Sequence, residues 1–332
     1  MFKNKHGKVR SGWKILAVTA ISFSISLIIS LIIYFITGII IATQDGFNLE
    51  TLDLNEKGTE IAANVQFVIT IIEKLIFLAV PILTWKYFFK RPLSNMGLPS
   101  IKKHGKELLI GLVFGIISIS FVFILLLLSN NASVALWEPQ FSTSLISYLV
   151  LYTIVGFSEE IMGRGFIMAT LRQSRNLPLV LIVSSIIFAL LHSINPDFGI
   201  LPLINIALVG LLFAYMFIKS GNIWMPIGYH ITWNYFQGNI FGFNVSGLDQ
   251  NGLLTTELGS NKFISGGDFG PEGGIIVTIV VILSFTFVHF YYRDSTFDFI
   301  ASDDYISSGD ELVQMTNNST DYETEENQKT NN

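Results

Sequence analysis

Long uncharged apolar runs alternate with short polar segments along almost the whole chain. A helix of about 20 apolar residues crosses the hydrocarbon core of a bilayer, so runs of this kind indicate membrane helices. Eight candidates lie near residues 13–41, 65–88, 108–128, 144–171, 178–192, 200–218, 222–237 and 274–292. The pattern predicts an all-α, polytopic membrane bundle of about eight transmembrane helices.

The charges between these runs predict an orientation. Lys and Arg occur before the first run and after the second, fourth, sixth and eighth runs. The loops 42–64, 129–143 and 238–273 are acidic or nearly free of basic residues. Because cytoplasmic loops carry an excess of Lys and Arg, both termini are expected to face the cytoplasm of a multi-pass cell-membrane protein.

The amino-acid composition is typical of a membrane protein and limits the kinds of catalytic and metal site that the chain can form. Of 332 residues, 51% are hydrophobic and only 14% are charged, against about a quarter in soluble domains. The chain has no cysteine, which excludes disulfides, thiol nucleophiles and cysteine-ligated metals. No basic surface favours a nucleic-acid partner. The expected organisation is a basic cytoplasmic N-terminus (1–12), N-terminal transmembrane helices (13–143), a polar-residue-bearing transmembrane core (144–292) and an acidic disordered tail (293–332).

Polar side chains interrupt the apolar runs of the core. A charge at the bilayer centre costs roughly 2.5–3.5 kcal/mol on insertion scales, so such residues are functional candidates. At 1.5 Å per residue, Glu159 and His192 lie about 20 and 21 Å from the inner ends of their helices, and His230 lies about 12 Å from its own. Three helices are therefore predicted to bring these side chains to a common layer.

Helical geometry separates the two adjacent glutamates. Glu160 and Arg164 are four residues apart and are expected to pair. Glu159 has no such partner on its own helix, and Gly156 and Gly163 leave open space beside it. This arrangement predicts Glu159 as the working carboxylate and Glu160 as the structural one.

Two further motifs supply imidazole and amide groups. His192 follows Phe188 by one helical turn, so the aromatic ring is expected to fix the imidazole by packing. His230 and Asn234 share one helix face. Together they can donate two hydrogen bonds, which is what an oxyanion requires.

Three short sequences carry a family resemblance. They are EEIMGR (Glu159–Arg164), FALLH (Phe188–His192) and HITWN (His230–Asn234). Their order and spacing resemble the EExxxR, FxxxH and HxxxN motifs of the CPBP family, the CaaX-protease and bacteriocin-processing (Abi-like) intramembrane endopeptidases. The likeness covers roughly residues 144–280.

The resemblance implies an intramembrane protease fold and a hydrolytic site in residues 144–292. In it, Glu159 and His192 would activate water, while His230 and Asn234 would stabilise the oxyanion. The supporting residues would be Glu160, Arg164 and Phe188. The implied substrate is a membrane peptide or protein within the lipid bilayer, CaaX-like or related to bacteriocins or surface proteins, and no cofactor is implied.

The residues also leave other interpretations open. Glu159, His192 and His230 are the ligand types of many catalytic zinc sites, although the HExxH spacing of zincins is absent. A non-catalytic membrane binding or immunity protein would need no such chemistry. A proton-coupled transporter also uses chains of Glu and His.

Overall fold

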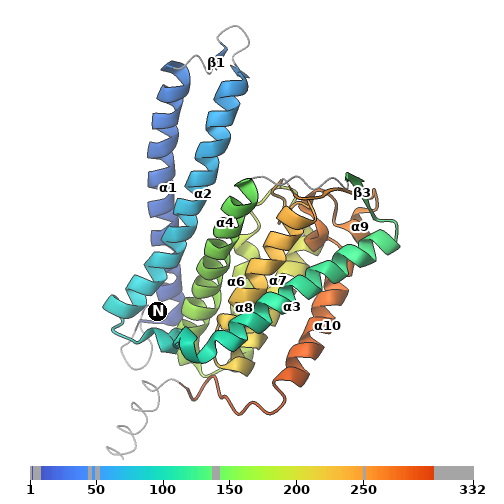
Figure 1. Ribbon diagram of the computed structural model, residues 1–332. Coiled ribbons are helices and arrows are strands. Elements are labelled where there is room, and N and C mark those ends of the chain that lie inside the picture. The colour runs from blue at the N-terminus through green and yellow to red at the C-terminus, as the bar shows by residue number, and fades with distance from the viewer. Residues whose placement is uncertain are drawn as a thin grey trace, which may run out of the picture.

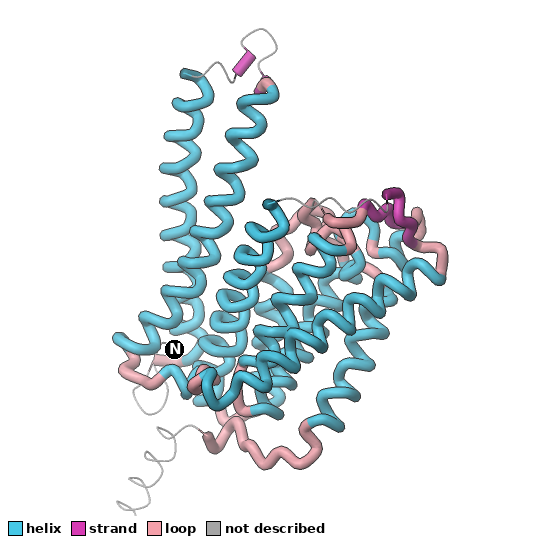
Figure 2. The backbone as a smooth tube through the Cα atoms, viewed as in Figure 1, coloured by secondary structure: helices cyan, strands magenta, loops and turns pink. Residues whose placement is uncertain are grey.

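The computed structural model describes residues 2, 9–43, 47–48, 53–136, 143–249 and 252–302. It is predominantly helical (Figures 1 and 2). A helix occupies each of the eight apolar segments. These helices are α1 (Ser11–Thr43), α2 (Glu56–Leu83), α3 (Ile101–Leu128), α4 (Thr143–Glu160), α6 (Leu177–Leu191), α7 (Ile200–Ser220), α8 (Trp224–Tyr235) and α10 (Ile275–Tyr291).

Smaller elements extend and connect the long helices. π-helical segments follow α2, α4 and α8 at Thr84–Phe88, Ile161–Met168 and Phe236–Ile240, and α5 (Ala169–Leu171) follows the second of them. Two antiparallel strand pairs, β1 (Phe47–Asn48) with β2 (Asp53–Leu54) and β3 (Ala132–Leu136) with β4 (Thr255–Leu258), lie in connections. Short helical turns at Leu93–Met96, Arg172–Ser174, Lys262–Ser265 (α9), Gly267–Phe269 and Pro271–Gly273 complete the described elements.

Length and hydropathy identify a membrane protein. Within the described residues, five helical stretches are long and apolar enough to cross a bilayer, namely Ser11–Thr43, Glu56–Phe88, Leu93–Leu128, Ser144–Ser174 and Ile200–Ser220. Helices α6 and α10 are apolar but shorter. Helix α8 has 12 residues, and almost all of its side chains are buried by neighbouring helices. The number of eight spans therefore stays a prediction.

The helices form a bundle with a projecting hairpin. Helices α1 and α2 pack together and extend beyond α4 at the β1 end (Figure 1). Helix α3 packs along α8, α6 pairs with α7, and α10 lies against α7 and α3. The N-terminus, the α2–α3 connection and the chain after α10 lie at one end of the bundle, which is the arrangement that the alternating basic segments require.

Glycines allow α3 and α8 to touch through their backbones. A Cβ atom at Gly111 would lie 2.1 Å from the carbonyl oxygen of Met225, and one at Gly228 would lie 2.4 Å from that of Leu108. Small residues permit such close approach where helices associate without a hydrophobic driving force. This contact fixes α8, and with it His230, against the bundle.

Replacing Gly228 with alanine is expected to destabilise the protein, because the added methyl group forces α3 and α8 apart. Overpacking of this kind costs about 1–3 kcal/mol. A lower midpoint of thermal unfolding in detergent would register the loss. Gly105→Ala is the matched control, since nothing lies within 4 Å of a Cβ atom there. Equal midpoints for the two variants would contradict the contact.

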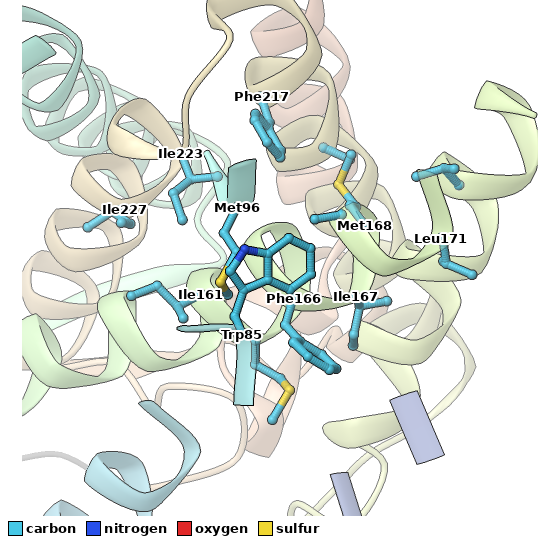
Figure 3. Close-up of a cluster of buried hydrophobic side chains, with 14 of the residues drawn as sticks. Trp85, Met96, Ile161, Phe166, Ile167, Met168, Leu171, Phe217, Ile223 and Ile227 are labelled. Atoms are coloured by element: carbon cyan, nitrogen blue, oxygen red, sulfur yellow. The ribbon is translucent and has the colours of Figure 1, made fainter. Parts of the chain in front are cut away.

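A buried aromatic cluster holds the segment that follows Glu160. Figure 3 shows Trp85, Met96 and Phe166 packed together. The indole Nε1 of Trp85 donates to the carbonyl oxygen of Pro92 at 3.1 Å. Because Met96 and Phe166 are fully buried, the π-helical segment Ile161–Met168 cannot shift without opening this core.

The expected disordered tail needs correction at its beginning. Phe299 is buried, with its ring 5.2 Å from that of Phe217, and the Arg172 guanidinium lies 4.1 Å from the Phe299 ring centre. Residues 293–302 are thus packed on the bundle, because an aromatic anchor offsets the polar composition. Residues 303–332 of the expected tail, and residues 1 and 3–8 of the basic N-terminus, lie outside the described part of the chain.

Candidate active site

A cavity of about 610 Å³ lies among α2, α4, α6, α7 and α8. Glu159, His192, His230 and Asn234 all line it. Glu160 does not, and its side chain is completely buried beside the cavity. The two neighbouring glutamates therefore face different surroundings, as the helical geometry predicts.

The Glu159 carboxylate meets both imidazoles. Its Oε2 lies 3.4 Å from His192 Nε2 and 3.8 Å from His230 Nε2. This oxygen is buried and has no hydrogen-bond partner among the described residues. The structure thus brings the three side chains into one layer, with an acceptor atom facing the space between them.

Close packing of α4 on α8 accounts for part of this geometry. A Cβ atom at Gly156 would lie 2.6 Å from the Ile231 side chain, so glycine lets the two helices approach just before Glu159. A Cβ atom at Gly163 would meet only Phe188, at 3.8 Å. The open space expected beside the carboxylate is therefore found at Gly163, whereas Gly156 serves helix contact.

The end of α6 fixes the ring of His192. His192 directly follows the last residue of α6, and its Nδ1 lies 2.8 Å from the carbonyl oxygen of Phe188. Because a carbonyl only accepts, Nδ1 carries the proton, and in the neutral ring Nε2 is then an acceptor turned toward Glu159. The Phe188 and His192 ring centroids are 4.8 Å apart, which is the packing expected for this motif.

Glu160 binds two partners at once. Its Oε1 accepts from Arg164 Nη1 and from His230 Nδ1, each at 3.0 Å. The Arg164 Nη2 donates to the Gly210 carbonyl oxygen at 3.0 Å. Pairing with Arg164 follows from the four-residue spacing, but the bond to His230 depends on how α8 packs and has no signal in the sequence.

The guanidinium of Arg164 is also enclosed by aromatic rings. It lies 4.2 Å from the centre of the Phe188 ring and 5.0 Å from that of Phe213. Phe188 therefore contacts both Arg164 and His192. The residues expected to support the site are thus contiguous: Phe188 lines the cavity, and Glu160 and Arg164 lie behind it.

Asn234 reaches the cavity from the same helix as His230. It lies one helical turn further along α8, close to the end of that helix, and is 7% exposed. Both side chains line the cavity, so the imidazole and amide of the third motif are available to the same bound group.

Lys74 is a site residue that the sequence reasoning missed. Its Nζ donates to Glu159 Oε1 at 2.6 Å. Lys74 lies on α2, inside the apolar run 65–88, where it and the adjacent Glu73 are ionisable residues among apolar ones. Counting back from Phe88 at 1.5 Å per residue places Lys74 about 21 Å from the inner end, the same level as Glu159 and His192. The sequence therefore contained enough information to place Lys74 at the depth of the site.

A folded segment, residues 236–249 and 252–274, contributes Val245, Ser246, Leu248 and Glu272 to the wall of the cavity. Glu272 Oε2 accepts from the backbone nitrogen and the hydroxyl of Ser246, each at 2.7 Å. Asn205 Nδ2 donates to the Glu272 carbonyl oxygen at 2.7 Å, and Asn195 Nδ2 donates to that of Ser246 at 3.0 Å. These bonds tie the glycine-rich segment to α7 and to the end of α6.

The wall between α2 and α4 is largely apolar. Beside the polar side chains of α2, it carries the apolar and aromatic side chains Phe67, Phe77, Tyr148, Leu151 and Tyr152. The rings of Phe67 and Tyr148 meet edge to face at 5.3 Å. An elongated apolar group would therefore find contacts on this wall beside the polar layer.

One known family model covers the part of the chain that contains the three motifs. Residues 140–236 match the family model described as Rce1-like, type II CAAX prenyl endopeptidase Rce1-like. Searches of curated proteins and of solved structures gave no match. The matched stretch contains all three motifs and ends two residues after Asn234. This stretch is therefore similar to the Rce1-like family, which supports the CPBP-family resemblance of its motifs and, at the level of reaction class, a peptidase.

Proposed function

We propose that the protein is an intramembrane endopeptidase in which Glu159 and His192 activate water. The observation that carries the proposal is the convergence of Glu159 Oε2 on the Nε2 atoms of His192 and His230 at the wall of a cavity. Similarity to the Rce1-like family makes peptide-bond hydrolysis the expected reaction class. The roles of the individual residues are inferred from their geometry.

The proposed step needs no covalent intermediate. A water held by His192 Nε2 gives a proton to Glu159 Oε2, and the resulting hydroxide attacks the scissile carbonyl carbon. The tetrahedral oxyanion accepts hydrogen bonds from His230 and Asn234, and one good donor of this kind contributes about 3–4 kcal/mol. Collapse breaks the C–N bond while Glu159 returns the proton to the leaving amine.

Glu160 prepares His230 for this role. A carboxylate only accepts, so the bond to Glu160 places a proton on His230 Nδ1. The proposed donation to the oxyanion uses a second proton, on Nε2, the ring nitrogen that faces Glu159 and the cavity. The Glu160 carboxylate, held by Arg164, thus orients the His230 imidazole as a hydrogen-bond donor.

The proposed substrate is a membrane-anchored peptide or protein. The aromatic wall between α2 and α4 suits an apolar chain or a lipid group, and the family model is named for prenylated CAAX substrates. A quenched fluorescent peptide ending in a farnesylated CaaX sequence is therefore the first probe. Its unprenylated counterpart tests whether the lipid is recognised.

The test uses the full chain reconstituted in liposomes. Wild-type protein is expected to cleave the farnesylated probe, and Glu159→Gln is not. Comparison of membrane peptides from cells that express the two forms would then identify natural substrates. Retained cleavage by Glu159→Gln would contradict the proposal, and a proton-gradient-driven flux lost in that variant would favour transport instead.

Hydrolysis is expected to survive strong chelators. Zinc bound by Glu159, His192 and His230 would lie beside the Lys74 ammonium, which already bonds to the same carboxylate at 2.6 Å. Two positive charges around one buried carboxylate repel each other at low dielectric. The test is the rate of probe hydrolysis after incubation with 1,10-phenanthroline and removal of the chelator by gel filtration. A loss that added Zn²⁺ restores would contradict the metal-free mechanism.

A further inference from the structure

Lys74 reaches the site from outside the matched domain. The family match covers residues 140–236, whereas Lys74 lies on α2 of the N-terminal hairpin. Its side chain is 30% exposed and lines the cavity, and its ammonium is 2.6 Å from Glu159 Oε1. The domain alone therefore lacks one of the groups that touch its principal carboxylate.

The hairpin holds Lys74 in this orientation. Helix α2 packs between α1 and α4. Glu73 accepts from the Ser30 hydroxyl of α1 at 3.0 Å, whereas Lys74 points to α4. Because adjacent residues on a helix point about 100° apart, the Glu73–Ser30 bond sets the rotation that turns Lys74 toward Glu159.

The two oxygens of Glu159 have different environments. Oε1 is bound by Lys74, while Oε2 is buried, lacks a hydrogen-bond partner among the described residues and faces His192 and His230. The terminal torsion of a glutamate is broad and roughly two-fold. Nothing within the carboxylate itself distinguishes its oxygens, so the lysine selects which one faces the imidazoles.

We propose that Lys74 is a positioning residue for the hydrolytic reaction, holding Glu159 Oε1 so that Oε2 is presented to the water-binding space. This role rests on the proposed function. The charged and titratable groups around Glu159 are Lys74 on α2, His192 after α6, His230 on α8 and, behind it, the Glu160–Arg164 pair. Lys74 alone among these reaches Oε1.

Kinetics on the farnesylated probe test the role. Lys74→Met is expected to lower kcat about 100-fold with little change in KM, since small misplacement of a catalytic group has effects of this order. Lys74→Arg should recover part of kcat. Lys86→Met, on an exposed lysine of the same helical stretch, is the matched control. Wild-type kcat in Lys74→Met, with Glu159→Gln inactive, would overturn the positioning role alone.

Chemical rescue distinguishes a loss of activity caused by the missing ammonium group from one caused by misfolding of the variant. The chain has no cysteine, so Lys74→Cys carries a single thiol. Alkylation with 2-bromoethylamine rebuilds a lysine-like ammonium and is expected to restore kcat, whereas iodoacetamide is not. Lys86→Cys treated in the same way should show no change. Failure of aminoethylation to restore activity, or equal recovery with iodoacetamide, would overturn the proposal.

Zero-length cross-linking tests the contact without any activity. A carbodiimide should join Lys74 to Glu159 through an isopeptide bond in the wild-type protein in liposomes, detected by mass spectrometry of the digest. Glu159→Gln and Lys74→Met should lose the cross-linked peptide, and Lys86→Met should keep it. Its absence from wild type would overturn the positioning role whatever the protein hydrolyses. If the cross-linked peptide is present but Glu159→Gln is still active, the proposed role of Glu159 in hydrolysis is wrong. The positioning role of Lys74, which depends on it, is then wrong as well.

Discussion

Glu159→Gln is expected to lower kcat on the farnesylated probe about 10³-fold, the middle of the range for loss of a general base. The amide keeps the size of the side chain and still accepts a hydrogen bond from Lys74. It cannot take a proton from water at Oε2, the atom that lies 3.4 Å from His192 Nε2. Initial rates of fluorescence release in liposomes measure the effect.

The control for this variant separates catalysis from folding. Glu107→Gln alters a carboxylate on α3 that does not line the cavity, and it should hydrolyse the probe at the wild-type rate. Both variants should remain folded at the assay temperature, with cooperative unfolding transitions in detergent. Hydrolysis by Glu159→Gln at the Glu107→Gln rate would show that another group is the base.

Arg164→Met is expected to reduce the free energy of unfolding by about 3–5 kcal/mol, the usual result of removing one partner of a buried ion pair. It takes away one of the two groups that donate to the Glu160 carboxylate, which has zero exposure, and leaves His230 as the remaining partner. The cavity layer should also loosen, because Arg164 fills the space between the Phe188 and Phe213 rings. Titration with SDS in mixed micelles measures the free energy.

A double variant tests the cause. Adding Glu160→Gln to Arg164→Met removes the carboxylate charge that has lost its guanidinium, while leaving an oxygen that accepts from His230. The double variant is expected to be more stable than Arg164→Met alone, and the difference gives the coupling between the two sites. A double variant that loses the sum of both single effects would contradict a buried ion pair.

Much of the arrangement is contained in the chain itself. Apolar run lengths gave the long helices because a bilayer requires continuous apolar stretches. Counting residues along the helix axis gave the common depth of Glu159 and His192, because rise per residue is fixed. The four-residue spacing gave the Glu160–Arg164 pair, although the segment that contains Arg164 is π-helical.

Other parts depend on packing that no single segment encodes. The bond between His230 and Glu160 exists because α3 and α8 meet through glycines, which sets how deeply α8 sits. Lys74 is a different case, because its depth in the membrane could be calculated from the sequence, whereas the direction of its side chain toward Glu159 could not. The burial of Phe299 contradicts the expectation from an acidic, polar segment, because one aromatic side chain docks on Arg172.

Helices α6 and α8, with 15 and 12 residues, are only about 22 and 18 Å long, against a hydrocarbon core of about 30 Å. Neighbouring helices cover α8, whereas α6 exposes Leu179, Ile182, Ile186 and Leu190. Lipid beside α6 must therefore thin or leave a gap filled by protein. Beyond the end of α6, Asn195 Nδ2 donates to the Ser246 carbonyl oxygen, so the described part of the glycine-rich segment, 236–249 and 252–274, lies where that gap would be. A polypeptide threaded through the bilayer would thus meet a local dip in the membrane at the level of the imidazoles, where its helix would run out of hydrocarbon and unwind.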